Sequence, residues 1–154
     1  MNRLIIEKYK EYPNVQLYTI RLSSKEFNET DDFILRFKDN KEYIEDFQKI
    51  ITYINKIGEN GVLERYFRPE NNAQAIPVGV NKLRFYCYRI NDNILILGNG
   101  GVKTSQTVQD SMDCYPHFVL VNKVAKIMEK AIKRRQVSIE NKKLNGKLNF
   151  DIYE

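Results

Sequence analysis

Two β-rich runs separated by a short polar stretch constrain this 154-residue chain more than any other feature. The first run covers residues 82–90, with the sequence KLRFYCYRI, and the second covers residues 94–98, with the sequence ILILG. Only Asn91, Asp92 and Asn93 stand between them. Two such runs joined by a three-residue polar turn predict a β-hairpin, so an antiparallel sheet is expected in the second half of the chain.

The alternation of side chains along the first run predicts two different faces, because successive residues of a strand point to opposite sides. One face is expected to carry polar and aromatic side chains, which are Arg84, Tyr86 and Tyr88. The other is expected to carry mostly apolar ones, which are Leu83, Phe85 and Cys87, together with Arg89. This division is typical of a sheet with one buried face and one exposed, working face.

Hydrophobic periodicity predicts a pair of helices before the hairpin. The clearest one spans about residues 40–56, where apolar side chains recur at steps of three and four, namely Ile44, Phe47, Ile51 and Ile54. Asp39 and Glu42 have the spacing of a capping box at its start, and Gly58 is placed for a C-cap. A short second helix is expected over residues 61–67.

Residue types and hydrophobic periodicity predict the other strands, helices and loops. Strands are predicted at residues 15–22 and 33–37, and a last strand over residues 147–153 follows the Asn145-Gly146 turn. A helix is expected over about residues 118–135. The polar or glycine-rich segments are expected to form loops and turns; these are residues 23–32, 70–74 and 98–101.

These elements define the expected fold class. It is α+β, with an antiparallel β-sheet, an N-terminal helical pair and a C-terminal helix. No repeat and no Gly/Ser/Pro-rich linker divides the sequence, so residues 1–154 are expected to form a single domain. Hydrophobic residues make up 42% of the chain and aromatic ones 12%, which excludes an intrinsically disordered protein.

The net charge of +5 is concentrated in the second half of the chain. Residues 1–80 hold 12 Lys and Arg against 13 Asp and Glu, whereas residues 81–154 hold 13 against 7. A basic half on a nearly neutral body favours a polyanionic partner, either nucleic acid or an acidic protein. The alternative is a basic surface that only keeps the protein soluble.

The N-terminal segment carries only three consecutive apolar residues before charge returns, which is too few for a signal peptide. The longest apolar runs are far below the roughly 20 residues of a membrane span. A soluble, cytoplasmic protein is therefore expected. In that compartment Cys87 and Cys114 are predicted to be free, buried thiols.

One group of side chains in and near the hairpin has the chemistry of a phosphate-binding site. Guanidinium groups such as those of Arg84 and Arg89 bind phosphate through a planar donor fork, and Lys103 adds a cation. The rings of Tyr86 and Tyr88 could stack on unpaired bases. The alternative is that these Tyr and Arg side chains form cross-strand pairs on a solvated sheet face.

Three other sequence features are weaker indications of function. The segment from Gly98 to Thr104 lacks P-loop spacing, so it favours a plain turn over nucleotide hydrolysis. His117, the single histidine, favours a structural or surface role over a catalytic one. Four lysines recur at helical spacing, which favours a solvated helix face first and phosphate contact second; they are Lys123, Lys126, Lys130 and Lys133.

The order of elements resembles the RelE/ParE superfamily of bacterial toxins, in particular its RelE/HigB-like branch. That family has an "Arg-x-x-Tyr-Arg-Ile/Val" strand, then an "Ile-x-Leu-x-x-Gly/Phe-x-Lys-Lys" strand. Here the similar segments are residues 83–90, residues 94–98 and Gly101-Val102-Lys103-Thr104. The chain departs from the pattern at Thr104, which replaces the second Lys, and in its longer stretch 105–117.

The resemblance divides the chain into an N-terminal extension at about residues 1–38, a RelE-like core at about 39–135 and a C-terminal tail at 136–154. It implies a type II toxin that cleaves mRNA, on the ribosome in many members, without a metal or other cofactor. It also implies an acidic antitoxin as protein partner. The alternative is a non-catalytic RNA- or protein-binding module of the same fold, similar to the ParE branch, which acts on gyrase.

Carried over to this sequence, the resemblance implies two sets of site residues. Those with catalytic roles in holding phosphate, stabilising charge or transferring protons are Arg84, Lys103, Tyr88 and Arg89. Those expected to bind RNA are Tyr86, Lys82, Lys123 and Lys126.

Overall fold

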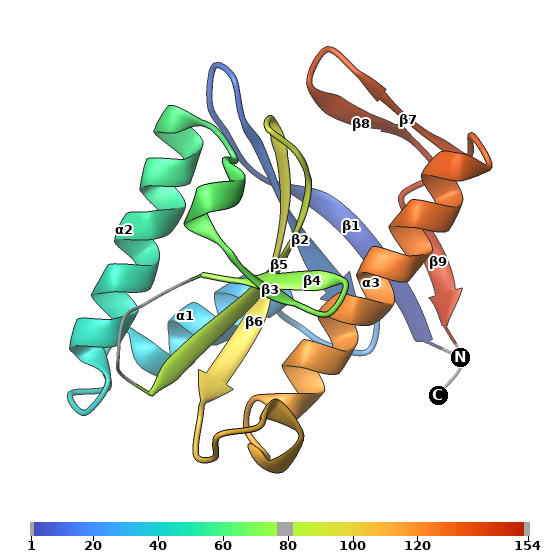
Figure 1. The fold of residues 1–154 in the computed structure, drawn as a ribbon. Coiled ribbons are helices and arrows are strands. Elements are labelled where there is room, and N and C mark those ends of the chain that lie inside the picture. The colour runs from blue at the N-terminus through green and yellow to red at the C-terminus, as the bar shows by residue number, and fades with distance from the viewer. Residues whose placement is uncertain (1, 77–81, 153–154) are drawn as a thin grey trace.

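A computed structural model describes residues 2–76 and 82–152 of the chain. In this part of the chain the fold is α+β, with three α-helices and a mixed sheet of seven strands (Figure 1). The helices are α1 (Glu29–Phe37), α2 (Ile44–Asn60) and α3 (Tyr115–Lys133). Two 3-10 turns are η1 (Glu64–Tyr66) and η2 (Val108–Asp110). The strands are β1 (Asn2–Glu11), β2 (Gln16–Leu22), β3 (Arg68–Glu70), β4 (Ala73–Ala75), β5 (Leu83–Asn91), β6 (Ile94–Val102), β7 (Val137–Glu140), β8 (Lys143–Gly146) and β9 (Asn149–Ile152).

The large sheet has the strand order β3-β4-β5-β6-β2-β1-β9, and β7 and β8 form a separate hairpin. All pairs in the large sheet are antiparallel except β2 with β6, which run parallel. The prediction of an antiparallel sheet is wrong at that pair. Parallel neighbours need a long crossover connection, and α1 and α2 lie within the one that leads from β2 to β6.

The chain begins with strands and not with helices, because a β1–β2 hairpin precedes α1 and α2. Strand β1 was not predicted. The predicted strand 15–22 is confirmed as β2. Its partner β1 alternates buried and more exposed side chains, with Leu4 and Ile6 in the core. The other face holds Arg3, Ile5 and Glu7, which are more exposed, and this is the pattern of a strand with one buried face.

The predicted strand 33–37 is wrong, because these residues form the second half of α1. Asn28 caps this helix by accepting the backbone N–H of Asp31 at 2.8 Å. Phe33 and Phe37 lie one helical turn apart and are both buried, with ring centroids 5.1 Å apart. A five-residue apolar run fits a strand or a helix, and here the cap and the Phe pair decide for the helix.

Helix α2 confirms the predicted helix 40–56 but is displaced toward the C-terminus. It begins after Tyr43, whose side chain makes no capping bond, so the predicted capping box is wrong. Gly58 lies inside the helix, and Gly61 ends it with a φ of 110°, a conformation that favours glycine. The predicted second helix 61–67 is reduced to η1, and the predicted loop 70–74 overlaps the β3–β4 hairpin.

The central hairpin is confirmed as β5 and β6, but β6 continues through the predicted turn 98–101 to Val102. Gly100 explains why this glycine-rich stretch can pair. A Cβ atom added there would lie 1.7 Å from the carbonyl oxygen of Arg84 on β5. The two strands therefore approach more closely than any other residue type would allow.

The C-terminal elements follow the prediction more closely. The helix expected over residues 118–135 is α3, and the last strand is β9, which pairs with β1. Tyr153, the end of that predicted strand, lies outside the described residues. The β7–β8 hairpin was not predicted. No helix in the described ranges combines the length and apolar character needed to cross a membrane.

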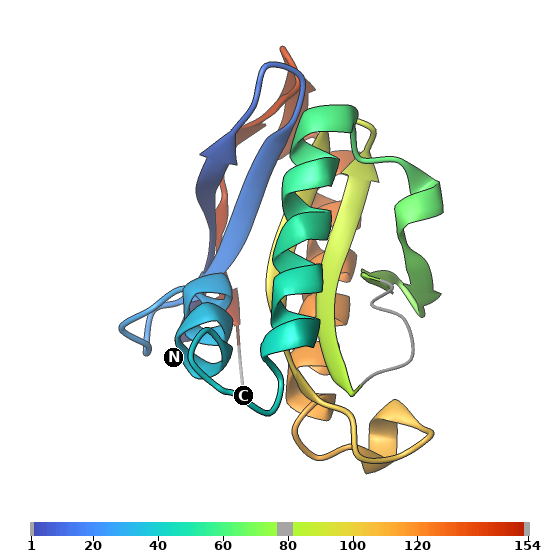
Figure 2. The same cartoon turned by 90° about the vertical axis from the view of Figure 1, so that its left-hand side faces the viewer.

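Helices cover both faces of the sheet, which therefore has two cores (Figure 2). Helices α1 and α2 pack on the face that carries Leu83, Phe85 and Cys87. Helix α3 packs on the face that carries Tyr86 and Tyr88. The predicted alternation is confirmed, but the predicted exposed, working face is wrong, because α3 buries its two tyrosines.

Candidate nucleic-acid interface

Two adjoining hollows form a groove at the open end of the β5–β6 hairpin, where β5 begins and β6 ends. Each holds several hundred Å³, about 470 Å³ for the first and about 420 Å³ for the second. Both are lined by Arg84, Lys103 and Gln106, so they lie next to each other. The first extends to the β3–β4 hairpin and the start of α3, and the second to Lys82 and Ser105.

The groove is strongly basic. Four of the described residues that line it are cationic, namely Arg68, Lys82, Arg84 and Lys103, and none of the described lining residues is acidic. Of the eight residues predicted for the site, Lys82, Arg84, Lys103 and Tyr86 are brought together here. A hollow lined by cations and neutral polar groups suits an anion such as phosphate.

The last pairs of the hairpin position these cations. Arg84 lies opposite Gly101 in the β5–β6 register. Lys103 follows the end of β6, and its backbone N–H donates to the carbonyl oxygen of Lys82 at 2.6 Å. The guanidinium of Arg84 also donates to the carbonyl oxygen of Leu83 at 3.0 Å. A rigid sheet end, and not a free loop, therefore sets the spacing of Lys82, Arg84 and Lys103.

The two predicted tyrosines lie beneath this groove or away from it. Tyr86 is only 2% exposed and reaches the groove from below, with its ring 5.9 Å from that of Phe118 in an edge contact. Tyr88 is 8% exposed and belongs to the core under α3, where burial and the charge of Glu129 raise its pKa. Neither tyrosine presents an open ring face for base stacking.

Arg89 lies near the turn of the hairpin, and its contacts there stabilise the fold. Its Nε donates to the carbonyl oxygen of Val62 at 2.7 Å. Its guanidinium also pairs with Asp92 and, at 3.5 Å, with Glu64. It fastens the β5–β6 turn to the segment after α2 and does not line the groove.

Lys123 and Lys126 are exposed on the outer face of α3, as expected for a solvated row, and do not line the groove. Helix α3 contributes Phe118 to the groove instead. One turn later, the Asn122 side chain accepts the backbone N–H groups of Asn72 at 2.8 Å and Ala73 at 3.0 Å. Asn122 thereby fixes the β3–β4 hairpin as one wall of the groove.

Sequence reasoning missed several groove residues, which are Arg68, Asn71, Gln106, Gln109 and Phe118. Three of them, Asn71, Gln106 and Gln109, come from segments whose sequence is that of polar loops. Such segments have no periodicity that would bring them together in a sequence-based prediction.

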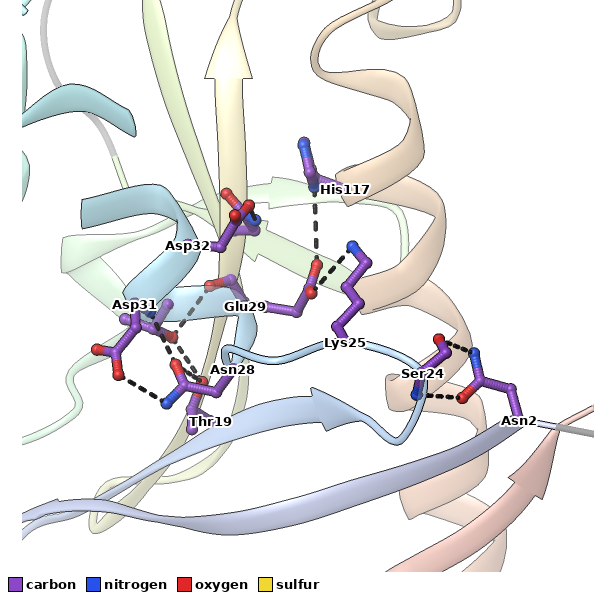
Figure 3. Close-up of polar contacts among 12 residues, drawn as sticks. Asn2, Thr19, Ser24, Lys25, Asn28, Glu29, Asp31, Asp32 and His117 are labelled. Atoms are coloured by element: carbon purple, nitrogen blue, oxygen red, sulfur yellow. Dashed lines mark hydrogen bonds and ion pairs between the residues drawn. The ribbon is translucent and has the colours of Figure 1, made fainter. Parts of the chain in front are cut away.

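A second polar cluster gathers around the N-terminus of α1 (Figure 3). Its contacts reach the central strands, because Thr30 contacts Thr19 of β2 at 2.7 Å and donates to the carbonyl oxygen of Gly98 at 3.1 Å. The Asn99 side chain donates to Asp32 at 2.9 Å. These bonds fix α1 across the parallel β2–β6 pair.

Helix α3 joins the same cluster through His117, which points toward the buried carboxylate of Glu29 (Figure 3). Their closest atoms, Nδ1 and Oε1, lie 4.0 Å apart, and Lys25 pairs with the same carboxylate at 3.3 Å. Burial lowers the pKa of His117 to about 4; the charge of Arg36 adds to this effect and that of Asp113 opposes it. The imidazole is therefore neutral near pH 7 and structural, in line with the sequence reading.

Asp113 connects this cluster to the groove. Its carboxylate accepts two contacts from Arg36 of α1, at 2.8 and 2.9 Å, and the backbone N–H of Val102 at 2.7 Å. Nearby, Ser111 accepts the backbone N–H groups of Thr104 and Ser105, both at 3.1 Å. The segment after β6, which holds Lys103, is thus braced at both ends.

The two cysteines lie inside the fold and not at its surface. Cys87 and Cys114 are free and buried, as predicted, and burial raises the pKa of both thiols. Within the described ranges, no three His, Cys, Asp or Glu side chains gather in an arrangement that could hold a metal ion.

Comparison with known proteins finds no significant match between this chain and any protein-family model, curated protein or solved structure.

Proposed function

We propose that this chain binds RNA in the basic groove and acts as a toxin-like endoribonuclease of the type II toxin-antitoxin kind. The observation that carries the proposal is the gathering of Arg68, Lys82, Arg84 and Lys103 around one groove without a described acidic side chain. The positive charges of such a lining attract a phosphate backbone, and no described carboxylate in the lining opposes that attraction. The RelE/HigB-like order of elements around β5 and β6 suggests mRNA as the substrate, engaged on the ribosome.

The proposed reaction is attack by a ribose 2′-oxygen on the adjacent phosphorus. The O2′–P bond forms and the P–O5′ bond breaks, which leaves a 2′,3′-cyclic phosphate and a 5′-hydroxyl end. Arg84 stabilises the charge that develops on the phosphoryl oxygens. Lys103 donates a proton to the leaving 5′-oxygen, and the 2′-hydroxyl proton passes to solvent.

The proposed protein partner is an acidic antitoxin. Its carboxylates would compete with RNA phosphate for the same cations, so binding of the two would be mutually exclusive. The exposed lysines Lys123 and Lys126 on α3 extend the positive surface beyond the groove and are proposed to add non-specific attraction for either polyanion.

A non-catalytic RNA-binding module is the second candidate, and a specific observation favours it. Tyr88 is buried in the core, and Arg89 is engaged at the hairpin turn. Two of the four residues expected to be catalytic are therefore outside the groove, whereas phosphate binding needs only the cations that remain.

The test is incubation of the purified protein with 5′-labelled single-stranded mRNA, once without ribosomes in buffer containing EDTA and once with ribosomes in buffer containing Mg²⁺. Lys103→Ala and Arg84→Ala should abolish cleavage and growth arrest. Lys49→Ala is the matched control, because Lys49 is exposed on α2, on the opposite side of the sheet. Binding that depends on Lys103 without cleavage products would establish the non-catalytic alternative, and absence of binding would refute both.

A further inference from the structure

We infer that the groove holds one unpaired nucleotide in two parts, with its phosphate in the second hollow and its base in the first. The inference rests on the proposed function for the phosphate and adds the substrate class, which is single-stranded RNA read at one base. Its starting point is a chemical difference between the two hollows.

Among the described residues, the second hollow is lined by cationic side chains, hydroxyl groups and one amide. Beyond the shared Arg84, Lys103 and Gln106 it has Lys82, Thr104 and Ser105. Hydroxyl donors and cations are the groups that bind phosphate oxygens, and none of these side chains offers a flat apolar surface. This hollow has the chemistry of a phosphate subsite alone.

The first hollow adds neutral amides and an aromatic ring to its cations. Beyond the shared residues its lining includes Arg68, Asn71, Gln109 and Phe118. An amide side chain presents both donors and acceptors, which is what the Watson–Crick edge of a base requires. The volume of about 470 Å³ lies within the roughly 300–1,000 Å³ of small-molecule sites.

Phe118 supplies an aromatic ring to the lining of this hollow. Its ring contacts that of Tyr86, at 5.9 Å in an edge contact, and that of Tyr115, at 6.4 Å in a stacked contact. The buried Tyr86 thereby contributes indirectly, as support for the ring that lines the groove. Stacking of a base on an aromatic ring strengthens binding and needs an unpaired base.

The opposite wall is equally fixed. Asn71 lies at the tip of the β3–β4 hairpin with a φ of 63°, and the next two residues donate their N–H groups to Asn122. Ala75, at the end of this hairpin, pairs with Tyr86 of β5. A base in the first hollow would therefore meet a preformed site, and a preformed site favours binding that discriminates among the four bases.

The test measures the affinity of the full chain for fluorescein-labelled eight-nucleotide RNAs of the four base compositions, and for a duplex RNA of equal length. We expect at least fivefold differences among the single strands and at least tenfold weaker binding of the duplex. Gln109→Ala and Phe118→Leu should reduce the differences among bases. Lys103→Ala should weaken all RNAs by a similar factor.

The outcomes separate this inference from the proposed function. Equal affinity for all single strands, unchanged by Gln109→Ala but weakened by Lys103→Ala, would overturn the base subsite and leave RNA binding intact. Absence of RNA binding by the wild-type chain at low salt would overturn both. Gln109 is exposed, so its replacement keeps the test valid if Phe118→Leu does not fold.

Discussion

Asp113, just before α3, accepts a two-point contact from Arg36 of α1 at 2.8 and 2.9 Å, across the end of β6. The same carboxylate receives the backbone N–H of Val102. One side chain therefore holds together a helix from the first third of the chain, the end of a central strand and the segment that carries Lys103. The groove depends on this brace, although neither Asp113 nor Arg36 lines it.

Replacement of Asp113 should loosen the groove. Asp113→Ala removes the ion pair and leaves the Val102 N–H without its acceptor, so we expect a loss of about 1–3 kcal/mol in the free energy of unfolding. Arg36→Ala removes the same ion pair, whose charges are about one-third exposed, and a bond to the Gly100 carbonyl oxygen at 3.2 Å, but it keeps the Val102 bond, so it should cost less. Urea denaturation measures both variants, and equal losses would contradict the special role of the Val102 bond.

His117 predicts a dependence of stability on pH. Its pKa is about 4 in the folded chain against 6.5 in the unfolded chain, so the unfolded state binds the proton first on acidification. Stability contributed by the neutral imidazole is complete above about pH 6.5 and is lost progressively down to pH 4, by no more than about 3 kcal/mol.

His117→Gln is the control for this prediction, because glutamine is polar but does not titrate. Thermal unfolding between pH 7 and pH 4.5 should show a smaller decline for the variant than for the wild type. Parallel curves for the two proteins would show that His117 is not the titrating group.

Asn122 predicts a local effect on the β3–β4 hairpin. Asn122→Ala leaves the N–H groups of Asn72 and Ala73 without their acceptor, and we expect a loss of about 1–3 kcal/mol. Hydrogen exchange should accelerate at these two amides before it does in β5. Lys123→Ala, at an exposed neighbouring position, should leave the exchange rates unchanged.

Arg89 should behave as a stability residue and not as an RNA-binding one. Arg89→Ala breaks the bond to the Val62 carbonyl and the pairs at the hairpin turn, for a loss of about 1–3 kcal/mol. The affinity of the folded protein for RNA should stay within twofold of the wild type. A tenfold loss of affinity in a fully folded variant would place Arg89 in the site after all.

The sequence predicted the elements whose signals are local. The β5–β6 hairpin follows from two β-rich runs and a short polar turn, and α2 follows from an apolar stripe. Residues 33–37 were wrongly predicted as a strand, because Phe33 and Phe37 suit both a strand end and one helical turn. The cap at Asn28 and the packing of the two rings decide for the helix.

The candidate site was predicted only in part, because its remaining residues meet through tertiary contacts. Strand alternation placed Tyr86 and Tyr88 on one face correctly, but only the packing of α3 reveals that this face is buried. Arg68 and Gln109 come from a short strand and a 3-10 turn, β3 and η2, on either side of the hairpin in the sequence. No local pattern signals that Asn122 and Asp113 bring those segments together.

The most direct test of the central claim is the salt dependence of affinity for single-stranded RNA. Each phosphate contact made by a cation steepens the slope of log affinity against log salt by about 0.7 for single strands. The Arg84→Ala/Lys103→Ala double variant should therefore have a slope shallower by about 1.4. A control that removes two cations from α2, Lys49→Ala/Lys56→Ala, should keep the wild-type slope. Equal slopes for wild type and both double variants would contradict RNA binding in the groove.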